Sequence, residues 1–203
     1  MRLALALAGL VLLLAGCAGA APDGPGRAAA PQAATTERVA ADAVVPVSVR
    51  VPAIGVDEPE VLSLGVAPDG TAEVPQDYAR VGWFDRTLSA QRAGATPADV
   101  PLPAGRGPTV LLGHVDSRRG PAVFFRLRDL RPGDVVEVGR SDGSVAGYAI
   151  ERTEQVAKDT FPTFAVFGAT ATDVLRLVTC AGDFDRGARS YTDNLVVHAV
   201  RVR

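Results

Sequence analysis

The chain has 203 residues, of which 47% are hydrophobic and 22% charged, and its formal net charge at pH 7 is −2. There is no basic excess, so a surface that tracks a nucleic acid backbone is not expected. The length is sufficient for one domain with a sizeable core, preceded by shorter segments.

The N-terminus has the pattern of an export signal. Met1 and Arg2 are followed by an uncharged stretch over residues 3–21, which predicts an extracytoplasmic mature domain. Within this stretch, LAGC at 14–17 resembles the lipobox of bacterial lipoproteins, in which cleavage before the cysteine is coupled to lipidation of its thiol. Residues 1–17 would then be a signal peptide and Cys17 the lipid anchor. The alternative is an uncleaved signal anchor in the membrane, since about 20 apolar residues can span a bilayer.

A low-complexity segment follows the export signal. Residues 18–46 are rich in Ala, Pro and Gly and contain no aromatic residue, so they cannot bury enough apolar surface to order themselves. We expect a flexible tether here. The remaining residues, 47–203, have the size of a single domain.

Short β-type runs separated by Gly, Pro and Asp dominate this domain. Eight strands are predicted, which implies a mainly β fold of the barrel or sandwich type. In chain order they are 47–51, 60–64, 71–74, 109–113, 134–139, 147–156, 174–179 and 195–202.

The connections between these strands have signals of their own. Asp69-Gly70 and Asp142-Gly143 predict tight turns, because glycine readily adopts a positive φ. Apolar residues at helical spacing over 122–130 predict a short helix, whose Phe residues are expected in the core. Residues 87–106 are polar and rich in Gly and Pro, and predict a long surface loop.

One thiol remains in the predicted exported domain. Cys180 ends the apolar run 174–180, and His114 ends a similar run at 109–114, so both are expected at strand ends, where a fold can place a nucleophile beside its base. The alternative for Cys180 is that it is a buried, unreactive packing residue, which is common for free cysteines. The alternative for His114 is a loop histidine bonded to Asp116. The other histidine, His198, alternates with valines in a strand and is expected to be buried or on the barrel surface.

Seven stretches in chain order together resemble one family. From about residue 51 to 200 the chain is similar to the sortases, and most similar to the class F sortases of actinobacteria. This resemblance implies an eight-stranded β-barrel transpeptidase. The stretches are VPAIGV at 51–56, GVAPDGTAEVP at 65–75, VGWF at 81–84, VLLGHVDS at 110–117, FFRLRDLRPGDVVEV at 124–138, LVTCAG at 177–182 and YTDNLVVHA at 191–199.

The resemblance assigns roles to two residues. Cys180 matches the nucleophile that attacks a backbone carbonyl and forms an acyl-enzyme thioester. His114 matches the acid and base that protonates the leaving amine and later deprotonates the incoming one. A free thiol with a pKa of about 8.5 is mostly protonated at neutral pH, so it needs such a neighbour.

The third member of the site departs from the common family pattern, which has an arginine near the start of the last strand. Counting back from VHA at 197–199 places Asn194 at that register, and an amide can still donate in an oxyanion hole. Arg186 and Arg189, in the loop after the cysteine, are the nearest arginines. Asn194 and Arg189 are therefore rival candidates. Thr179 matches the family's Thr-Cys pair and is a candidate for substrate positioning, or equally a β-branched strand residue.

The resemblance implies an exported, membrane-tethered cysteine transpeptidase. Its substrates would be surface proteins with an LPXTG-like sorting signal, cut between Thr and Gly, and the acyl group would pass to an amine of a cell-wall precursor or a pilin. The alternatives are a hydrolase on the same scaffold and a non-catalytic lipoprotein that binds peptides or cell-wall components. No cofactor is needed for this chemistry, and no metal-ligand spacing is present around Asp116, Asp183 and Asp185.

Overall fold

The computed structural model describes residues 44–92 and 107–202. The predicted signal peptide with Cys17, most of the predicted tether and residues 93–106 of the predicted surface loop lie outside the described residues. Within them, nine strands form one sheet in the order β2-β1-β8-β9-β11-β10-β5-β4-β3, and β6 and β7 form a separate pair.

The strands are short at the start of the domain and long at its end. Their bounds are β1 Pro46–Val51, β2 Val56–Glu58, β3 Leu62–Leu64, β4 Gly82–Phe84, β5 Thr109–Leu112, β6 Asp116–Ser117, β7 Gly120–Pro121, β8 Val135–Arg140, β9 Val145–Ala157, β10 Val174–Asp185 and β11 Ser190–Arg201. The helices are η1 Pro52–Ile54, α1 Arg86–Arg92, η3 Phe125–Asp129, η4 Lys158–Thr160 and α2 Thr163–Phe167.

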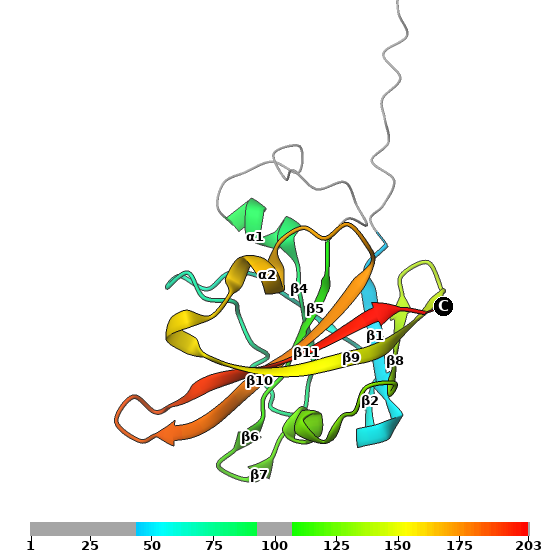
Figure 1. Ribbon diagram of the computed structural model, residues 1–203. Helices are drawn as coiled ribbons and strands as arrows, with labels where there is room; N and C mark the ends of the chain where they lie inside the picture. Colours follow the sequence, from blue (N-terminus) through cyan, green and yellow to red (C-terminus); the bar gives the residue numbers. More distant parts are fainter. Residues whose placement is uncertain (1–43, 93–106, 203) are drawn as a thin grey trace, which may run out of the picture. The chain divides into compact units, whose positions relative to one another are not determined.

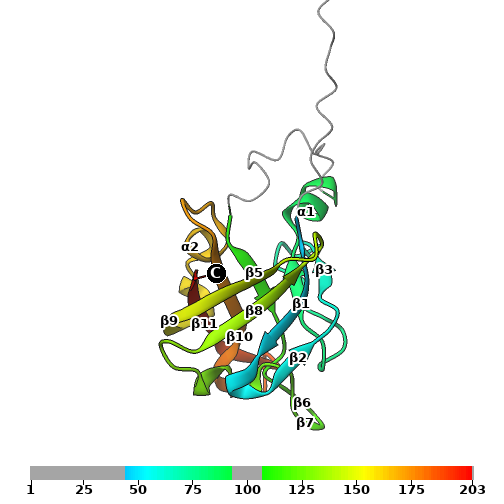
Figure 2. The ribbon, with the colours of Figure 1, turned by 90° about the vertical axis from the view of Figure 1, so that its right-hand side faces the viewer.

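The sheet curls, so that β1, β2 and β8 lie on one side and β5, β10 and β11 on the other (Figures 1 and 2). The main core fills the space inside the curl, where Leu111, Leu177 and Val197 meet Val136 and Tyr148. The opposite face of β5, β10 and β11 carries a second apolar cluster, which packs under α2 and β3. That cluster comprises Leu64, Val110, Leu112, Val166, Val178 and Val196.

The prediction of a mainly β fold is confirmed. The alternation of apolar residues explains the two clusters, because successive residues of a strand point to opposite faces. Gly70 and Gly143 have φ values of 85° and 81°, so both predicted Asp-Gly turns form. The second of them joins β8 to β9 as a hairpin.

Several details of the predicted elements were wrong. The main sheet has nine strands, and two of them, β2 and β4, were not among the eight predicted. Residues 71–74 form no strand, and only an isolated bridge joins Val66 to Ala72. The helix predicted over 122–130 is a 3-10 turn, η3, because its apolar residues pack against the barrel end within one short turn. Residues 87–92 belong to helix α1 and not to a loop. Of the two Phe residues expected in the core, Phe124 is fully buried and Phe125 is only partly buried.

Polar side chains are paired where β10 begins and β11 ends. One Arg140 nitrogen donates to the Tyr148 hydroxyl at 2.8 Å and to Asp173 at 2.7 Å, and the Tyr148 hydroxyl donates to Asp173 at 2.8 Å. Arg201 lies 3.2 Å from the same carboxylate. We call Arg140, Tyr148, Asp173 and Arg201 the closing cluster. Within the described part of the chain, none of the helices is long and apolar enough to cross a membrane.

Candidate active site

Three residues singled out from the sequence lie in one row across adjacent strands. β5 pairs in parallel with β10, and Leu112 lies beside Val178, so two residues further His114 comes beside Cys180. On the other side of β10, Asn194 of β11 is the direct partner of Cys180. Neighbouring strands are about 4.8 Å apart. The backbone register therefore places the partly exposed Cys180 between His114 and Asn194.

Two hydrogen bonds continue the contact between β5 and β10 beyond their last paired residues. The Gly113 N–H donates to the Val178 carbonyl at 3.3 Å, and the buried Thr179 hydroxyl donates to the Gly113 carbonyl at 2.8 Å. The peptide that carries His114 is thereby fixed against the strand that carries Cys180. Thr179 thus has a structural partner; its role in substrate positioning stays a prediction.

The imidazole of His114 contacts the segment between β3 and β4. Its Nε2 lies 2.7 Å from the Pro75 carbonyl oxygen, and the Tyr78 ring lies against it with a centroid distance of 4.4 Å. A carbonyl oxygen only accepts hydrogen bonds, so Nε2 carries the hydrogen and Nδ1 is the nitrogen left for proton transfer. His114 does not bond to Asp116, which was the alternative interpretation of this histidine.

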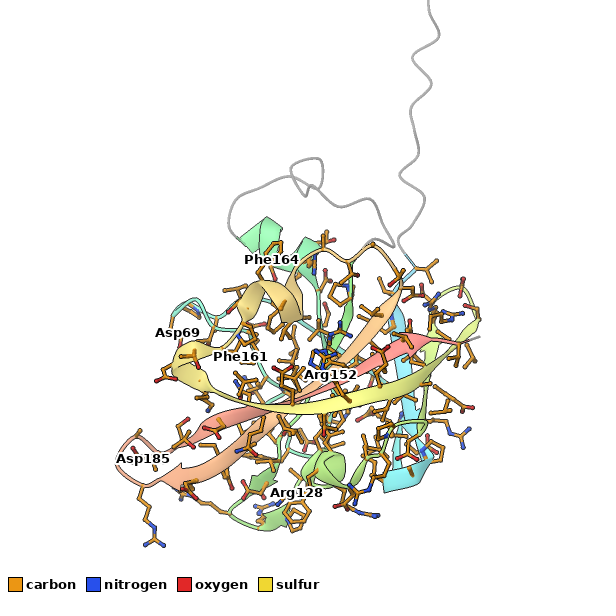
Figure 3. All side chains as sticks on the ribbon, in the orientation of Figure 1. Asp69, Arg128, Arg152, Phe161, Phe164 and Asp185 are labelled. Atoms are coloured by element: carbon orange, nitrogen blue, oxygen red, sulfur yellow. The ribbon has the colours of Figure 1, made fainter. Side chains whose placement is uncertain are left out.

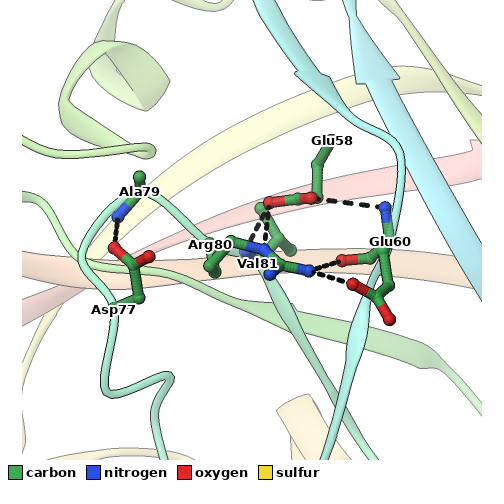
Figure 4. A network of polar contacts seen from close by, with 6 residues as sticks. All are labelled: Glu58, Glu60, Asp77, Ala79, Arg80 and Val81. Atoms are coloured by element: carbon green, nitrogen blue, oxygen red, sulfur yellow. Dashed lines mark hydrogen bonds and ion pairs between the residues drawn. The ribbon is translucent and has the colours of Figure 1, made fainter.

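A polar network holds the segment that contacts His114 (Figure 4). The buried Glu58 carboxylate accepts from Arg80 Nε at 3.2 Å and from the Val81 N–H at 3.3 Å. Arg80 also donates to the carbonyl and the carboxylate of Glu60, both at 2.8 Å, and this bonding raises the pKa of Arg80. Asp77 accepts from the Ala79 N–H at 2.9 Å. The turn that contacts the imidazole is therefore anchored at its C-terminal end.

The hairpin of β10 and β11 bends immediately after Cys180. The register shifts between Ala181 and Phe184, and Gly182 there has a φ of 78°. A Cβ at this position would collide with Thr192 and Asp193. Glycine is thus required by both backbone conformation and close packing, and the bend separates the hairpin tip from the end of the barrel.

Arg189 lies away from the row of three residues. It occupies the turn of the hairpin with a φ of 54° and is exposed, next to Ser190, the partner of Asp185. Asp185 is seen at the hairpin tip in Figure 3. About five strand residues separate this tip from Cys180, a distance on the order of 16 Å. The exposed Arg186 lies in the same turn. Of the two rival candidates, only Asn194 lies beside the thiol.

A pocket of 330 Å³ opens beside Cys180. Within it the Tyr191 hydroxyl donates to Asp116 Oδ2 in a short hydrogen bond, which raises the pKa of Tyr191. Arg128 of η3 lies at the same end of the barrel, with its guanidinium 4.6 Å from the centre of the Phe125 ring (Figure 3). The lining residues are Val115, Asp116, Phe124, Phe125, Arg128, Gln155, Thr179, Cys180, Ala181, Gly182, Tyr191 and Leu195.

Sequence reasoning did not find this polar pair of Asp116 and Tyr191, nor Arg128. The three residues come from segments far apart in the chain, and no local pattern links them. Their only sequence signal is position: Asp116 follows the predicted base by two residues, and Arg128 and Tyr191 lie within stretches that carry the family resemblance.

His198 is buried on β11, as predicted. Its Nε2 lies 3.1 Å from Glu154, yet neither ring nitrogen makes a hydrogen bond of good geometry. Burial, together with the nearby charges of Arg176 and Arg152, lowers its pKa from 6.5 to about 4. A neutral, enclosed imidazole suits a packing role. No group of three or more His, Cys, Asp or Glu residues that could hold a metal ion occurs in the described ranges 44–92 and 107–202.

A comparison with family models matches residues 49–202 to the sortase domain. A comparison with curated proteins gave no match.

Solved structures similar to this chain are sortases of several classes. Sortase A of Corynebacterium diphtheriae, a lid mutant, has a TM-score of 0.50 and 20% identity over 78% of this chain and 70% of that one. Sortase C1 of Streptococcus agalactiae has a TM-score of 0.51 and 20% identity over 77% and 66%. The Sortase D5 transpeptidase of Clostridium perfringens has a TM-score of 0.50 and 15% identity over 78% and 79%. At these identities the likeness shows the shared fold.

Proposed function

Because the chain belongs to the sortase family, whose members are cysteine transpeptidases, we propose that it cleaves an LPXTG-like sorting signal between Thr and Gly and transfers the acyl group to an amine. The observation that carries this proposal is the row of His114, Cys180 and Asn194 across three adjacent strands. Such a row supplies a nucleophile, a proton carrier and a hydrogen-bond donor within one small area.

In the first half-reaction the Cys180 thiol gives its proton to His114, and the resulting thiolate attacks the threonine carbonyl carbon. A C–Sγ bond forms while the carbonyl oxygen gains negative charge, and the Asn194 amide is suited to donate a hydrogen bond to it. The scissile C–N bond then breaks. His114 protonates the departing glycine nitrogen, so that a thioester and a free peptide amine result.

In the second half-reaction an amine attacks the thioester. The new C–N bond forms as the C–Sγ bond breaks, and the proton lost by the amine passes through His114 to the thiolate. Because Nε2 of this residue donates to the Pro75 carbonyl, we assign both proton transfers to Nδ1. Asn194 carries no fixed charge, unlike the arginine common in the family, so slower amine capture, and hydrolysis in its place, is the second candidate function.

We further propose that the enzyme is of class F and acts outside the cytoplasm, tethered by a lipid on Cys17 or by its apolar N-terminal segment. The tether over residues 18–46 would let the domain reach substrates held at the same membrane. Its partners would be surface proteins with LPXTG-like signals and an amine of a peptidoglycan precursor or pilin. The support for this part is the sequence pattern of the first 46 residues and the seven resembling stretches.

Intact mass spectrometry of the full chain incubated with a Leu-Pro-x-Thr-Gly peptide tests the proposal. We expect a thioester adduct in the wild type, and release of an amide product when an amine is added. The adduct should be absent from Cys180→Ala and strongly reduced in His114→Ala.

The chain offers a matched control for each substitution. Cys17→Ala removes the other cysteine and His198→Gln the other histidine, and both should keep the adduct. Release of free acid alone, with an amine present, would favour the hydrolase. No adduct and no cleavage over a varied set of peptides would contradict the proposal and favour a binding protein.

A further inference from the structure

The pocket beside Cys180 is lined by one acidic and one basic side chain, Asp116 and Arg128. We propose that it binds the acceptor of the second half-reaction, and that this acceptor is an amine with a carboxylate close to it, as in an amino acid, which Asp116 and Arg128 recognise together. The inference rests on the proposed function, and it names a substrate class for the same site.

The position of the pocket suits an acceptor. It shares Cys180 with the row of three residues, but its other walls come mainly from β6, β9, η3 and the hairpin of β10 and β11. His114 does not line the pocket, and its ring contacts Pro75 and Tyr78. The pocket volume of 330 Å³ is at the small end of ligand sites and fits a molecule of amino acid size.

Asp116 is held in place to meet an amine. Its Oδ2 accepts from the Tyr191 hydroxyl, and the edge of the Tyr191 ring packs against Phe184 with a centroid distance of 5.2 Å. Among the described residues, no hydrogen bond to Oδ1 is present. That oxygen can accept one N–H of a neutral amine, which leaves the nitrogen lone pair free to point at the acyl carbon on Cys180.

Arg128 supplies the complementary charge. Its Nε donates to the Phe125 carbonyl at 3.1 Å, and its guanidinium lies over the Phe125 ring. One hydrogen bond and one cation–π contact therefore position the side chain at the pocket. Within the described ranges it has no carboxylate partner. A guanidinium in this position binds a carboxylate through charge-assisted hydrogen bonds. The neighbouring Arg126 differs, because it is paired with Asp129 at 2.9 Å and lines another pocket.

The reaction balances without a further reagent. The amine nitrogen attacks the thioester carbon, the C–N bond forms as the C–Sγ bond breaks, and the amine proton passes through His114 to the Cys180 sulfur. The acceptor's carboxylate stays bound to Arg128 and is unchanged. An amine without a carboxylate can still react, but it is held by Asp116 alone.

Competition between two acceptors of nearly equal size tests the inference. The full chain is incubated with a Leu-Pro-x-Thr-Gly peptide and an equimolar mixture of glycine and glycinamide, and the two amide products and the free acid are quantified by mass spectrometry. The product ratio of glycine to glycinamide is compared between proteins, so the different basicities of the two amines cancel.

We expect Arg128→Gln to lower the glycine to glycinamide ratio about tenfold, which corresponds to about 1.4 kcal/mol, and Arg128→Lys to restore part of it. Asp116→Asn should lower both amide products relative to the free acid. The matched variant Arg126→Gln should keep the wild-type ratio.

Three outcomes would overturn the inference. One is an unchanged ratio in Arg128→Gln. Another is an equal fall in Arg126→Gln, which would indicate a general charge effect. The last is loss of the acyl-enzyme itself in Arg128→Gln, which would place Arg128 in the first half-reaction. A wild type that forms no acyl-enzyme at all contradicts the proposed function instead, so the two failures are distinguishable.

Discussion

The hairpin of β10 and β11 has two contrasting regions. Where β10 begins and β11 ends, the closing cluster is saturated: the Asp173 carboxylate accepts from Arg140 and Tyr148 and lies beside Arg201. Some six residues further along β10, the Cys180 thiol is free and partly exposed, and no hydrogen bond to it is present among the described residues. The same two strands thus carry a fully paired polar group and an uncommitted nucleophile.

This difference separates stability from chemistry. Burying polar groups is favourable only when they find partners, and the closing cluster fulfils that condition around the fully buried Tyr148. A reacting group must instead keep its reactive atom free for substrate. β5 ends at Leu112 and β9 at Ala157, so just beyond Cys180 the hairpin continues without a neighbouring strand of the sheet. The end of the surrounding strands is what makes room for a site.

The strongest test of the contrast is Cys180→Ala. We expect acyl-enzyme formation to fall at least about a thousandfold, because the nucleophile is lost, while the midpoint of thermal unfolding stays near the wild-type value. Mass spectrometry and calorimetry measure the two effects. A large fall in unfolding temperature would show that the thiol belongs to the packing as much as to the chemistry.

His198 lies on β11 between the two regions and should make stability depend on pH. In the unfolded chain its pKa is 6.5, and in the fold burial lowers it to about 4. Between these values the unfolded state binds more protons, so the free energy of unfolding falls as the pH is lowered from about 6.5 to about 4, by up to about 3 kcal/mol.

Urea denaturation over this pH range measures the effect. His198→Gln should flatten the dependence, and Arg152→Gln should make it shallower, because the pKa of His198 is raised when a nearby positive charge is removed. Equal slopes in the wild type and in His198→Gln would assign the dependence to other groups.

A substitution in the closing cluster should lower the stability of the fold and leave acylation intact, which is the opposite of the effect expected for Cys180→Ala. Asp173→Ala leaves the Tyr148 hydroxyl and the Arg140 guanidinium without their shared acceptor, and we expect a loss of about 2 kcal/mol in the free energy of unfolding. The estimate is kept low because Asp173 is partly exposed. Acylation of the folded fraction by peptide should persist. Asp159→Ala, at an exposed acid in η4, is the control and should be nearly neutral.

Local patterns predicted much of the fold and part of the site. The apolar run that ends at His114 predicted the end of β5 to within two residues, but Cys180 was wrongly expected at a strand end, because β10 continues to Asp185. His198 was expected to be either buried or on the barrel surface, and it is buried. The roles of His114 and Cys180 stay predictions. The pocket could not be predicted, because Asp116, Arg128 and Tyr191 meet only after the sheet has curled. Alternation over 71–74 was misleading, since that segment has only a bridge for a partner.

The smallest expected effect concerns the hydrogen bond that joins Thr179 of β10 to Gly113, the residue after the end of β5. Thr179→Val keeps the shape of the side chain but removes the hydrogen bond to the Gly113 carbonyl, at a cost of about 1 kcal/mol. Because that peptide precedes His114, the rate of acylation should fall further than stability alone explains. Thr153→Val, at an exposed position of β9, is the matched control and should change neither quantity. If Thr179→Val loses stability but acylates at the wild-type rate, the hydrogen bond has only a structural role. The residues that stabilise the fold and those that react would then be more separate than proposed.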